Sequence, residues 1–223
     1  MKTRPARSAL GLALGIAAVL PTTVAPADVA KPTEWIGAEF VDAGSAEAAD
    51  VGRIGEAAIN WLGARMVREV NNALAKGSPE SAVAVCHLRN LGSPAGDVLN
   101  GMPAIKAIKR TSSRLLNPAN APDVAEQLVL DRVLRELNSD RPPTTTIVQK
   151  ISTGGGGVEW RVYRPLVILP SCLRCHGDPA EQSPELQTLL RRGAAENPAT
   201  GYRLGEWRGL LRVTVAPPAR SGT

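Results

Sequence analysis

The sequence predicts an α+β domain in which helices flank a small antiparallel sheet. Two observations lead to this prediction. Apolar residues recur at helical spacing through 46–76, and two β-rich runs, 144–152 and 158–169, stand on either side of the glycines at 154–157. Two such runs joined by a glycine-rich turn indicate a hairpin. Neither an internal repeat nor a linker is visible, so we expect one domain over 46–216.

The first predicted elements are two consecutive helices. In 46–76 the apolar residues fall on one stripe and a glycine follows the last turn. The second helix is predicted over 78–92, because Ser78 can cap it, Pro79 suits its first turn and Glu80 complements the positive helix end. The two helices form a hairpin whose apolar faces need a third surface to cover them. The residues of the first stripe are Ile54, Ala58, Trp61, Leu62, Val70 and Leu74.

The remaining elements follow in a mixed order. A short strand is predicted at 105–111, and the Asn- and Pro-rich segment 117–122 is a rigid turn. An amphipathic helix over 123–137 ends before a pair of prolines. After the hairpin we expect a short helix at 185–192 and a last strand at 209–215.

The N-terminus has the pattern of a secretory signal peptide, which we place at 1–27. Basic residues open the chain, an apolar run follows over 9–20, and Ala25-Pro26-Ala27 has the small-x-small pattern of a cleavage site. The apolar run is shorter than the roughly 20 residues that span a bilayer, so a cleaved signal is favoured over a membrane anchor. We therefore expect a periplasmic location.

Charge and composition narrow the partners further. The formal charge of the chain is +5, but Lys2, Arg4 and Arg7 belong to the predicted signal peptide. The remainder is close to neutral, which argues against nucleic acid as a partner. Residues 28–45, rich in Ala, Pro and Gly, are expected to be a disordered lead-in, and 217–223 a short tail.

The clearest chemical motif is C-x-x-C-H at residues 172–176. Cys172 and Cys175 can each form a thioether to a vinyl group of haem, and His176 then becomes the proximal iron ligand. A thioredoxin-type redox pair would need a βαβ context, which the predicted elements lack. A zinc site would need a second ligand pair, for which only one further Cys and one further His remain. We therefore predict one covalently bound haem c.

The residues alone do not decide which ligand lies on the other side of the iron. The candidates are Cys86, His87, Met66 and Met102, with a vacant position as a further alternative. Cys86 and His87 are helical neighbours about 100° apart around the axis, so one helix position cannot present both. A free cysteine can also be simply a small buried residue.

Aromatic residues make up only 3% of the chain. Haem is a large, flat and mostly apolar group, which can supply the bulk that Phe and Trp usually give to a core. We therefore expect the apoprotein to fold poorly.

The sequence resembles the bacterial family of exported, PAS-like c-type haem domains, long catalogued as a domain of unknown function. Members occur as free-standing proteins and as the sensory part of signalling proteins. The resemblance spans roughly 50–216, and the Asn-Pro-x-Asn-x-Pro and Thr-Gly-Tyr segments are its most specific parts. The segments that carry it are Leu74–Gly77, Ala82–Cys86, Arg110–Ser112, Asn117–Pro122, Tyr163–Leu166, Cys172–Gly177 and Ala199–Gly209.

This resemblance implies a PAS-like fold with a five-stranded antiparallel sheet, and a His/Cys pair of axial ligands. Carried over by position, His176 is the proximal ligand and Cys86 the distal one. The chain departs from the family after Cys86, where His87-Leu88-Arg89 replaces the usual Ala-Pro pair, so His87 stays available as an alternative ligand.

Several further residues are candidates for the haem pocket. Arg110, Arg164 and Tyr202 fall within the segments that carry the resemblance, and Arg203 and Arg208 lie in its last segment. Each arginine can pair with a haem propionate or can be a solvated surface charge. Tyr202 can equally be a packing residue.

The function that these features favour is a redox or small-gas sensor. A thiolate opposite His176 lowers the reduction potential of the iron, and its bond weakens on reduction, which would open the site to CO or NO. Only seven residues follow Ala216, so no output domain is expected and the signal would pass to a periplasmic or membrane partner protein. The alternative is a periplasmic electron-transfer cytochrome c. An enzyme is not favoured, because the sequence offers no acid–base pair near a vacant iron position.

Overall fold

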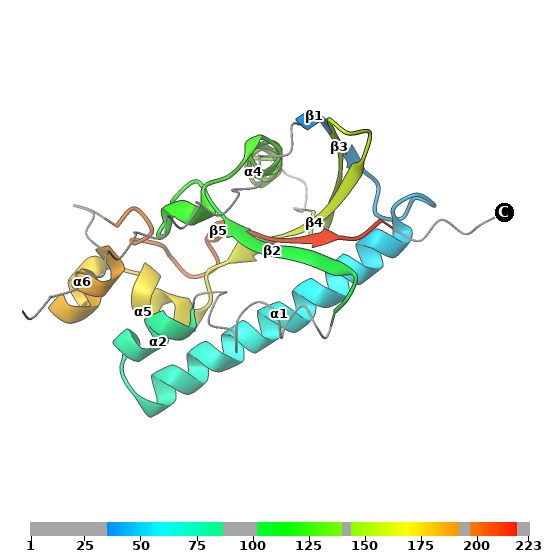
Figure 1. Cartoon of the computed structure of the whole chain (residues 1–223). Coiled ribbons are helices and arrows are strands. Elements are labelled where there is room, and N and C mark those ends of the chain that lie inside the picture. The colour runs from blue at the N-terminus through cyan, green and yellow to red at the C-terminus, as the bar shows by residue number, and fades with distance from the viewer. Residues whose placement is uncertain (1–34, 87–101, 140–143, 192–196, 218–223) are drawn as a thin grey trace, which may run out of the picture. The chain divides into compact units, whose positions relative to one another are not determined.

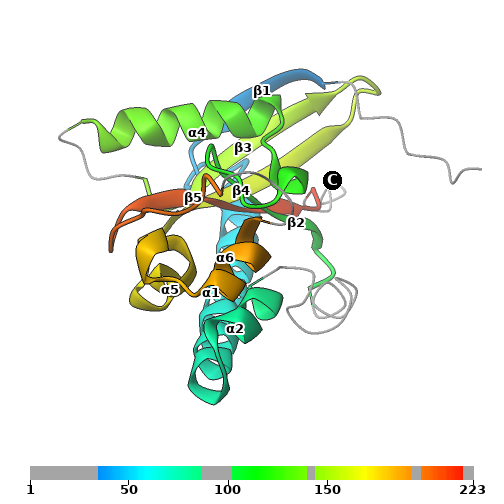
Figure 2. The same cartoon turned by 90° about the vertical axis from the view of Figure 1, so that its left-hand side faces the viewer.

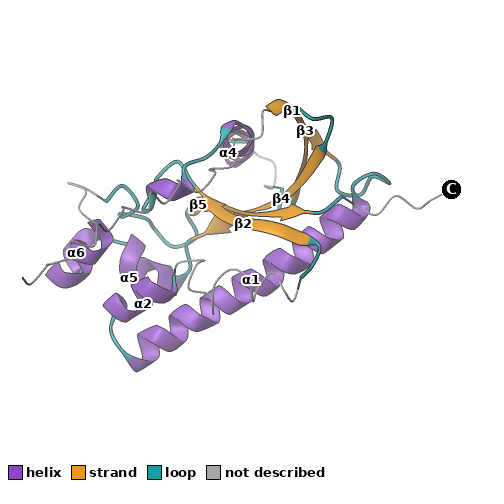
Figure 3. Ribbon diagram, viewed as in Figure 1, coloured by secondary structure: helices purple, strands orange, loops and turns teal. Residues whose placement is uncertain are grey.

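The structure is a computed structural model that describes residues 35–86, 102–139, 144–191 and 197–217 (Figure 1). A five-stranded antiparallel sheet of order β1-β3-β4-β5-β2 forms its centre. Helices lie on both faces of this sheet (Figure 3), which confirms the predicted α+β class. The strands are β1 (Trp35–Val41), β2 (Ile105–Thr111), β3 (Ile147–Thr153), β4 (Val158–Val167) and β5 (Trp207–Val215).

Strand β1 corrects one prediction. Residues 28–45 are predicted to be a disordered lead-in, but Trp35–Val41 pairs antiparallel with β3, with Ala38 opposite Ile151. The segment is short and contains a glycine and a glutamate, both depleted in strands, so its local pattern is weak. Its pairing with β3 supplies the order that the local sequence does not indicate. The other four strands lie within a few residues of their predicted positions.

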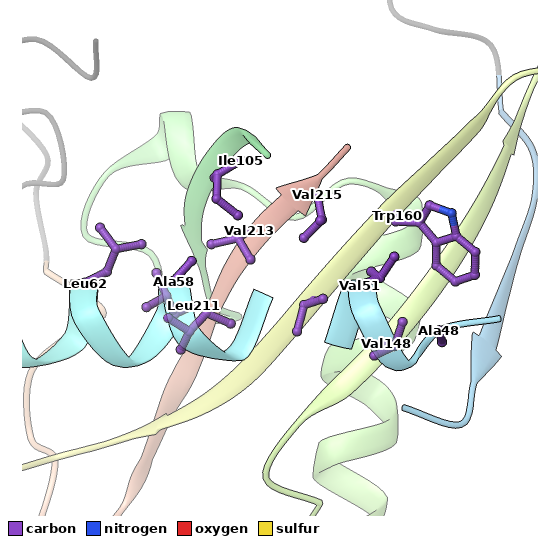
Figure 4. Packing of buried hydrophobic residues seen from close by; sticks show 12 residues of the cluster. Ala48, Val51, Ala58, Leu62, Ile105, Val148, Trp160, Leu211, Val213 and Val215 are labelled. Carbon is purple, nitrogen blue, oxygen red and sulfur yellow. The ribbon is translucent and has the colours of Figure 1, made fainter. Parts of the chain in front are cut away.

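The long helix α1 (Ala49–Lys76) covers one face of the sheet, as predicted. Its buried side chains meet those of β3, β4 and β5 in the main core (Figure 4). Gly55 allows the closest approach, because a side chain at this position would overlap Val162 of β4. Trp61 corrects the predicted apolar stripe, since it is 41% exposed and lies under the guanidinium of Arg65. The buried members of this core include Val51, Ala58, Leu62, Val148, Trp160, Val162, Leu211 and Val213.

Helix α4 (Val124–Leu137) covers the opposite face (Figure 2). Asp123 caps it, and the side chain of Glu126 accepts a bond from the backbone N–H of Asp123, which forms a capping box. Glu126 is fully buried and is paired with Lys109 of β2 at 2.6 Å and with Arg212 of β5 at 3.4 Å. The helix is therefore joined to the sheet by charge as well as by apolar packing.

Three short helices gather beside the C-terminal half of α1, beyond the end of the sheet (Figures 1 and 2). They are α2 (Pro79–Val85), α5 (Leu173–His176) and α6 (Pro184–Arg191). Val83 of α2 packs against Leu186 and Leu190 of α6, so α6 provides part of the third surface that the predicted helical hairpin requires. The predicted second helix begins as expected and its described part ends at Val85.

Some predicted features lie outside the described residues. These are the signal peptide (1–27), the lead-in up to residue 34, His87 with the end of its predicted helix, and the tail from 218 onward. Among the helices within the described ranges, none combines the length and the apolar character needed to cross a bilayer.

Candidate functional site

A cavity of about 320 Å³ lies between α1, α2, α5 and the neighbouring end of the sheet. His176 and all three cysteines of the chain line it, although Cys86 comes from the end of α2 and the others from the C-x-x-C-H motif. The structure thus brings Cys86 to the C-x-x-C-H motif. Most of the remaining wall is apolar, and its apolar residues include Met66, Val67, Val70, Leu74, Leu115, Leu116, Leu166 and Ile168.

The C-x-x-C-H motif forms a continuous helical turn. Cys172 ends a short 3-10 segment (Pro170–Cys172) and α5 follows at once, so Cys172 and Cys175 stand one turn apart on the same side. Burial raises the pKa of Cys172, and burial together with the neighbouring cysteine sulfurs raises the pKa of Cys175 to about 11. Neither thiol forms a disulfide in the structure. The motif therefore presents two neutral thiols to the cavity.

His176 is held in one orientation. It is 9% exposed, and its Nδ1 lies 2.6 Å from the carbonyl oxygen of Ala199. Because a carbonyl only accepts, Nδ1 carries the proton and Nε2 keeps its lone pair, which is the arrangement that metal-binding histidines use. Burial, with the positive charge of Arg208, lowers the pKa of His176 to about 4, so the ring is neutral near pH 7.

The Ala199 loop is built around a glycine turn. Gly201 has φ of 74°, a conformation that favours glycine, and its N–H donates to the carbonyl of Gly177 at 2.7 Å. The N–H of Tyr202 donates to the carbonyl of His176 at 2.9 Å. The loop therefore bonds to the backbone carbonyls of His176 and Gly177, at the end of the motif, as well as to the His176 ring.

Cys86 lies at the C-terminal cap of α2, where its N–H donates to the carbonyl of Ala82. Arg110 of β2 donates two hydrogen bonds to Cys86. Nη2 donates to the Cys86 carbonyl at 2.5 Å, and Nη1 donates to the Cys86 Sγ at 3.7 Å. The same Nη1 also donates to the Sδ of Met66 at 3.4 Å. Arg110, a predicted pocket residue, is thus in the cavity wall with its guanidinium on two sulfur atoms.

A second guanidinium, that of Arg208 in β5, also lines the cavity. It donates to the hydroxyl of Ser112 at 2.8 Å and to the carbonyl of Arg114 at 3.0 Å. Burial lowers the pKa of Arg208, and the charge of Arg110 contributes in the same direction. Within the described ranges, neither Arg110 nor Arg208 forms an ion pair with a carboxylate.

Tyr202 stands behind the cavity, not in its wall. It is 5% exposed, and its ring meets the edge of the His176 ring with centroids 6.3 Å apart. The guanidinium of Arg114 lies over its ring at 3.9 Å and that of Arg208 at 5.3 Å. Tyr202 therefore supports His176 by packing, which is one of its two predicted roles.

The other candidates lie away from the cavity wall or outside the described chain. Arg164 of β4 points to α1, where it bonds to Asn60 and pairs with Glu56 at 2.9 Å, which corrects its predicted place in the pocket. Arg203 is exposed in the loop before β5, and Met102 packs against the main core under α1. His87 lies outside the described residues.

Sequence reasoning misses two parts of this site. The carbonyl of Ala199 has no sequence signature, because any residue supplies a carbonyl. Arg114 is the second, since it bonds to the carbonyls of Pro198 and Thr200 and so holds the loop on either side of Ala199. The only sequence feature that indicates this loop is Gly201, because a glycine there indicates a tight turn.

The site fits the group that the motif predicts. Two thiols one turn apart, a neutral histidine beside them and a mostly apolar cavity match the needs of a flat apolar macrocycle with an iron at its centre. Across the described part of the chain, no three His, Cys, Asp or Glu side chains converge as a metal site of their own.

Comparison with known proteins gives one family. The sequence profile of the Tll0287-like family matches residues 64–216, which include the whole cavity-lining set except Gly63. The crystal structure of the cyanobacterial heme-protein Tll0287 aligns with a TM-score of 0.49 and 17% identity, over 79% of this chain and 100% of that chain. No curated protein sequence matches the chain.

Proposed function

This chain belongs to the Tll0287-like family, and from that premise we propose that it is an exported c-type haem protein that acts as a redox or small-gas sensor. The observation that carries the proposal is the convergence of Cys172, Cys175, His176 and Cys86 on one cavity. Tll0287, the protein after which the family is named, is a heme-protein, which agrees with this proposal. The same proposal includes a PAS-like fold for the sheet and its helices.

Each residue has a distinct task in this proposal. Cys172 and Cys175 hold the haem as thioethers, each formed when the S–H adds across a vinyl group. His176 offers Nε2 to the iron while Ala199 holds its Nδ1–H. The haem supplies one-electron chemistry and a position where a small gas can bind. The apolar wall excludes water from that position.

Cys86 is the proposed distal ligand, and through it a change at the iron would move the end of α2. It ends α2, and Arg110 ties its carbonyl to β2 at 2.5 Å. A change in the bond to the Cys86 sulfur would therefore act on the end of α2 and on a strand at the edge of the sheet. A ligand can shift such an equilibrium only by its different affinity for the two states, so CO or NO would act by competing with the distal ligand. The output would be read by a periplasmic or membrane partner protein.

The predicted export of the chain supports this role. Residues 1–27 have the pattern of a signal peptide, and a c-type haem is attached after export. We propose sensing and not catalysis, since the cavity wall offers the iron a sulfur ligand where an enzyme would keep an open position.

Electron transfer is the second candidate, and one observation favours it. Val167 and Leu169 line the cavity and are 51% and 37% exposed, so one side of the cavity is close to the protein surface. A haem edge near the surface is what an electron carrier needs. The two functions differ in whether the iron keeps its ligands during reduction.

One experiment tests the proposal and separates the two candidates. The chain is expressed with a haem-attachment system, and covalent haem is measured after denaturation for wild type, the double variant Cys172→Ala/Cys175→Ala and the matched control Cys86→Ser. We expect full attachment in wild type and Cys86→Ser, and loss in the double variant of the motif. Ferric EPR should differ from wild type in Cys86→Ser. Wild type without covalent haem would contradict the proposal, and identical ligands in both oxidation states would favour the electron carrier.

A further inference from the structure

We propose that Met66 is a second sulfur ligand of the iron, which replaces Cys86 when the iron is reduced. The inference rests on the proposed function, because it takes a haem on His176 as given. It deepens that function by naming what occupies the distal position in the ferrous protein.

The geometry places the two sulfur atoms on one hydrogen-bond donor. Nη1 of Arg110 donates to Met66 Sδ at 3.4 Å and to Cys86 Sγ at 3.7 Å. The two residues come from different helices, α1 and α2, and both line the cavity that His176 lines. Both side chains are half-buried. Beside His176 and Cys86, the site thus contains a further side chain that can bind iron.

The two sulfurs suit different oxidation states. A thiolate is anionic and stabilises ferric iron, whereas the neutral thioether of methionine opposite histidine raises the reduction potential and so stabilises ferrous iron. Reduction removes one positive charge from the iron, so the charge that favours the thiolate is lost. The Arg110 guanidinium keeps its positive charge and remains as a partner for the Cys86 sulfur.

The exchange balances without a further reactant. A one-electron donor of the kind that a redox role supplies reduces the iron. The bond between iron and Cys86 Sγ would break with both electrons on the sulfur, which would keep the hydrogen bond from Arg110. A lone pair of Met66 Sδ would then form the new bond.

The chain permits the movement. Methionine has three rotatable side-chain bonds and adapts to irregular space. Cys86 stays near its place after release, because Arg110 also holds its carbonyl at 2.5 Å. The exchange moves the link to the iron from the end of α2 to the middle of α1, the helix that packs on the sheet.

The test compares ferric and ferrous spectra and CO association rates of wild type, Met66→Leu and Met102→Leu. Leucine conserves the volume of methionine, and Met102 packs against the core and not the cavity, so Met102→Leu is the matched control. In Met66→Leu we expect an unchanged ferric EPR spectrum and a ferrous spectrum that changes from low-spin to high-spin. CO should bind about tenfold faster or more, because it no longer competes with Met66. The Met102→Leu protein should match wild type.

A second measurement needs no variant. In ferrous wild type with labelled methionine methyl groups, the Met66 methyl resonance should be shifted far upfield by the haem ring. Ferrous Met66→Leu with the wild-type spectrum and CO rate, or the lack of a shifted methyl resonance, would overturn the exchange while covalent haem and Cys86-dependent EPR keep the proposed function intact. A ferric spectrum altered by Met66→Leu would also overturn it. Wild type without covalent haem would overturn both proposals.

Discussion

The Nδ1 atom of His176 lies 2.6 Å from the carbonyl oxygen of Ala199, so a backbone group determines which face of the imidazole is free. That carbonyl is itself held in place. Arg114 Nε donates to the carbonyl of Pro198 at 2.7 Å, and its guanidinium also bonds to the carbonyl of Thr200. Arg114 therefore acts on His176 through the loop between them, as a positioning residue.

We expect Arg114→Ala to weaken the bond between His176 and the iron. Loss of a residue that orients a metal ligand typically costs about tenfold to 100-fold in metal affinity. A loosened Ala199 carbonyl donates less electron density through His176, so the reduction potential should rise. Loss of the Arg114 charge acts in the opposite direction, but Glu206 pairs with this charge at 3.6 Å, so we expect a net rise in potentiometric titration. The matched control is Arg203→Ala, because Arg203 is exposed and lies outside the cavity. Equal potentials in the two variants would contradict the role of Arg114.

A second prediction concerns the contact of Gly55 with Val162. In an exposed helix, Gly→Ala would stabilise by about 1 kcal/mol. At Gly55 the new methyl group overlaps Val162, and strain of this kind in a packed core costs about 1–3 kcal/mol. We therefore expect Gly55→Ala to lower the free energy of unfolding in urea, and Val162→Ala to restore part of the loss in the double variant. A Gly55→Ala protein as stable as wild type would show that α1 can move away from β4.

A third prediction follows from Glu136 at the end of α4. Burial alone would raise the pKa of Glu136, but hydrogen bonds from Arg132 and from Thr144 outweigh it and hold the pKa below its usual range. A lowered carboxyl pKa stabilises the fold above the unfolded-state pKa, and this contribution is lost as the pH falls through the folded-state pKa.

We therefore expect Glu136→Gln to lower the free energy of unfolding by about 1 kcal/mol at pH 7. The difference from wild type should shrink as the pH falls through the lowered pKa of Glu136 in the folded protein. Urea unfolding at pH 7 and at a pH below that pKa measures it. Exposed Glu185 in α6 provides the matched Glu→Gln control, which should differ little from wild type at either pH. An undiminished difference at low pH would show that the role of Glu136 does not depend on its charge.

The parts of the fold that were predictable are those with local signals. The helices α1 and α4 have apolar periodicity, and the β3–β4 hairpin has a glycine-rich turn between β-rich runs. Strand β1 was missed because its order comes from pairing with β3, a partner more than 100 residues away in the sequence. No local pattern encodes such a partner.

The same limit applies to the candidate site. The C-x-x-C-H turn is local and was predictable, whereas Cys86 was one of several candidates from the residues alone and only the family resemblance favoured it. The prediction placed Arg164 in the haem pocket, but neighbouring residues of a strand point to opposite faces of the sheet. The sequence does not show which of these faces a given helix covers. In β4, Tyr163 packs toward α4 and Arg164 turns to Glu56 of α1. Neither side chain lies in the cavity wall.

The last prediction uses this contrast between Arg208 and Arg164. Arg208 lines the cavity and pairs with no carboxylate among the described residues, whereas Arg164 is neutralised by Glu56 outside the cavity wall. A positive charge near the iron disfavours the ferric state, so Arg208→Gln should lower the reduction potential by on the order of 50 mV, if the charges interact through an effective dielectric constant near 20. Arg208→Lys keeps the charge and should restore most of the potential, and Arg164→Gln should leave it unchanged.

Because Arg208 also bonds to Ser112 and the Arg114 carbonyl, a loss of packing would affect the Lys and Gln variants alike. Equal shifts in these two variants would therefore assign Arg208 a role in packing, and a shift in Gln alone would establish that its charge acts on the iron.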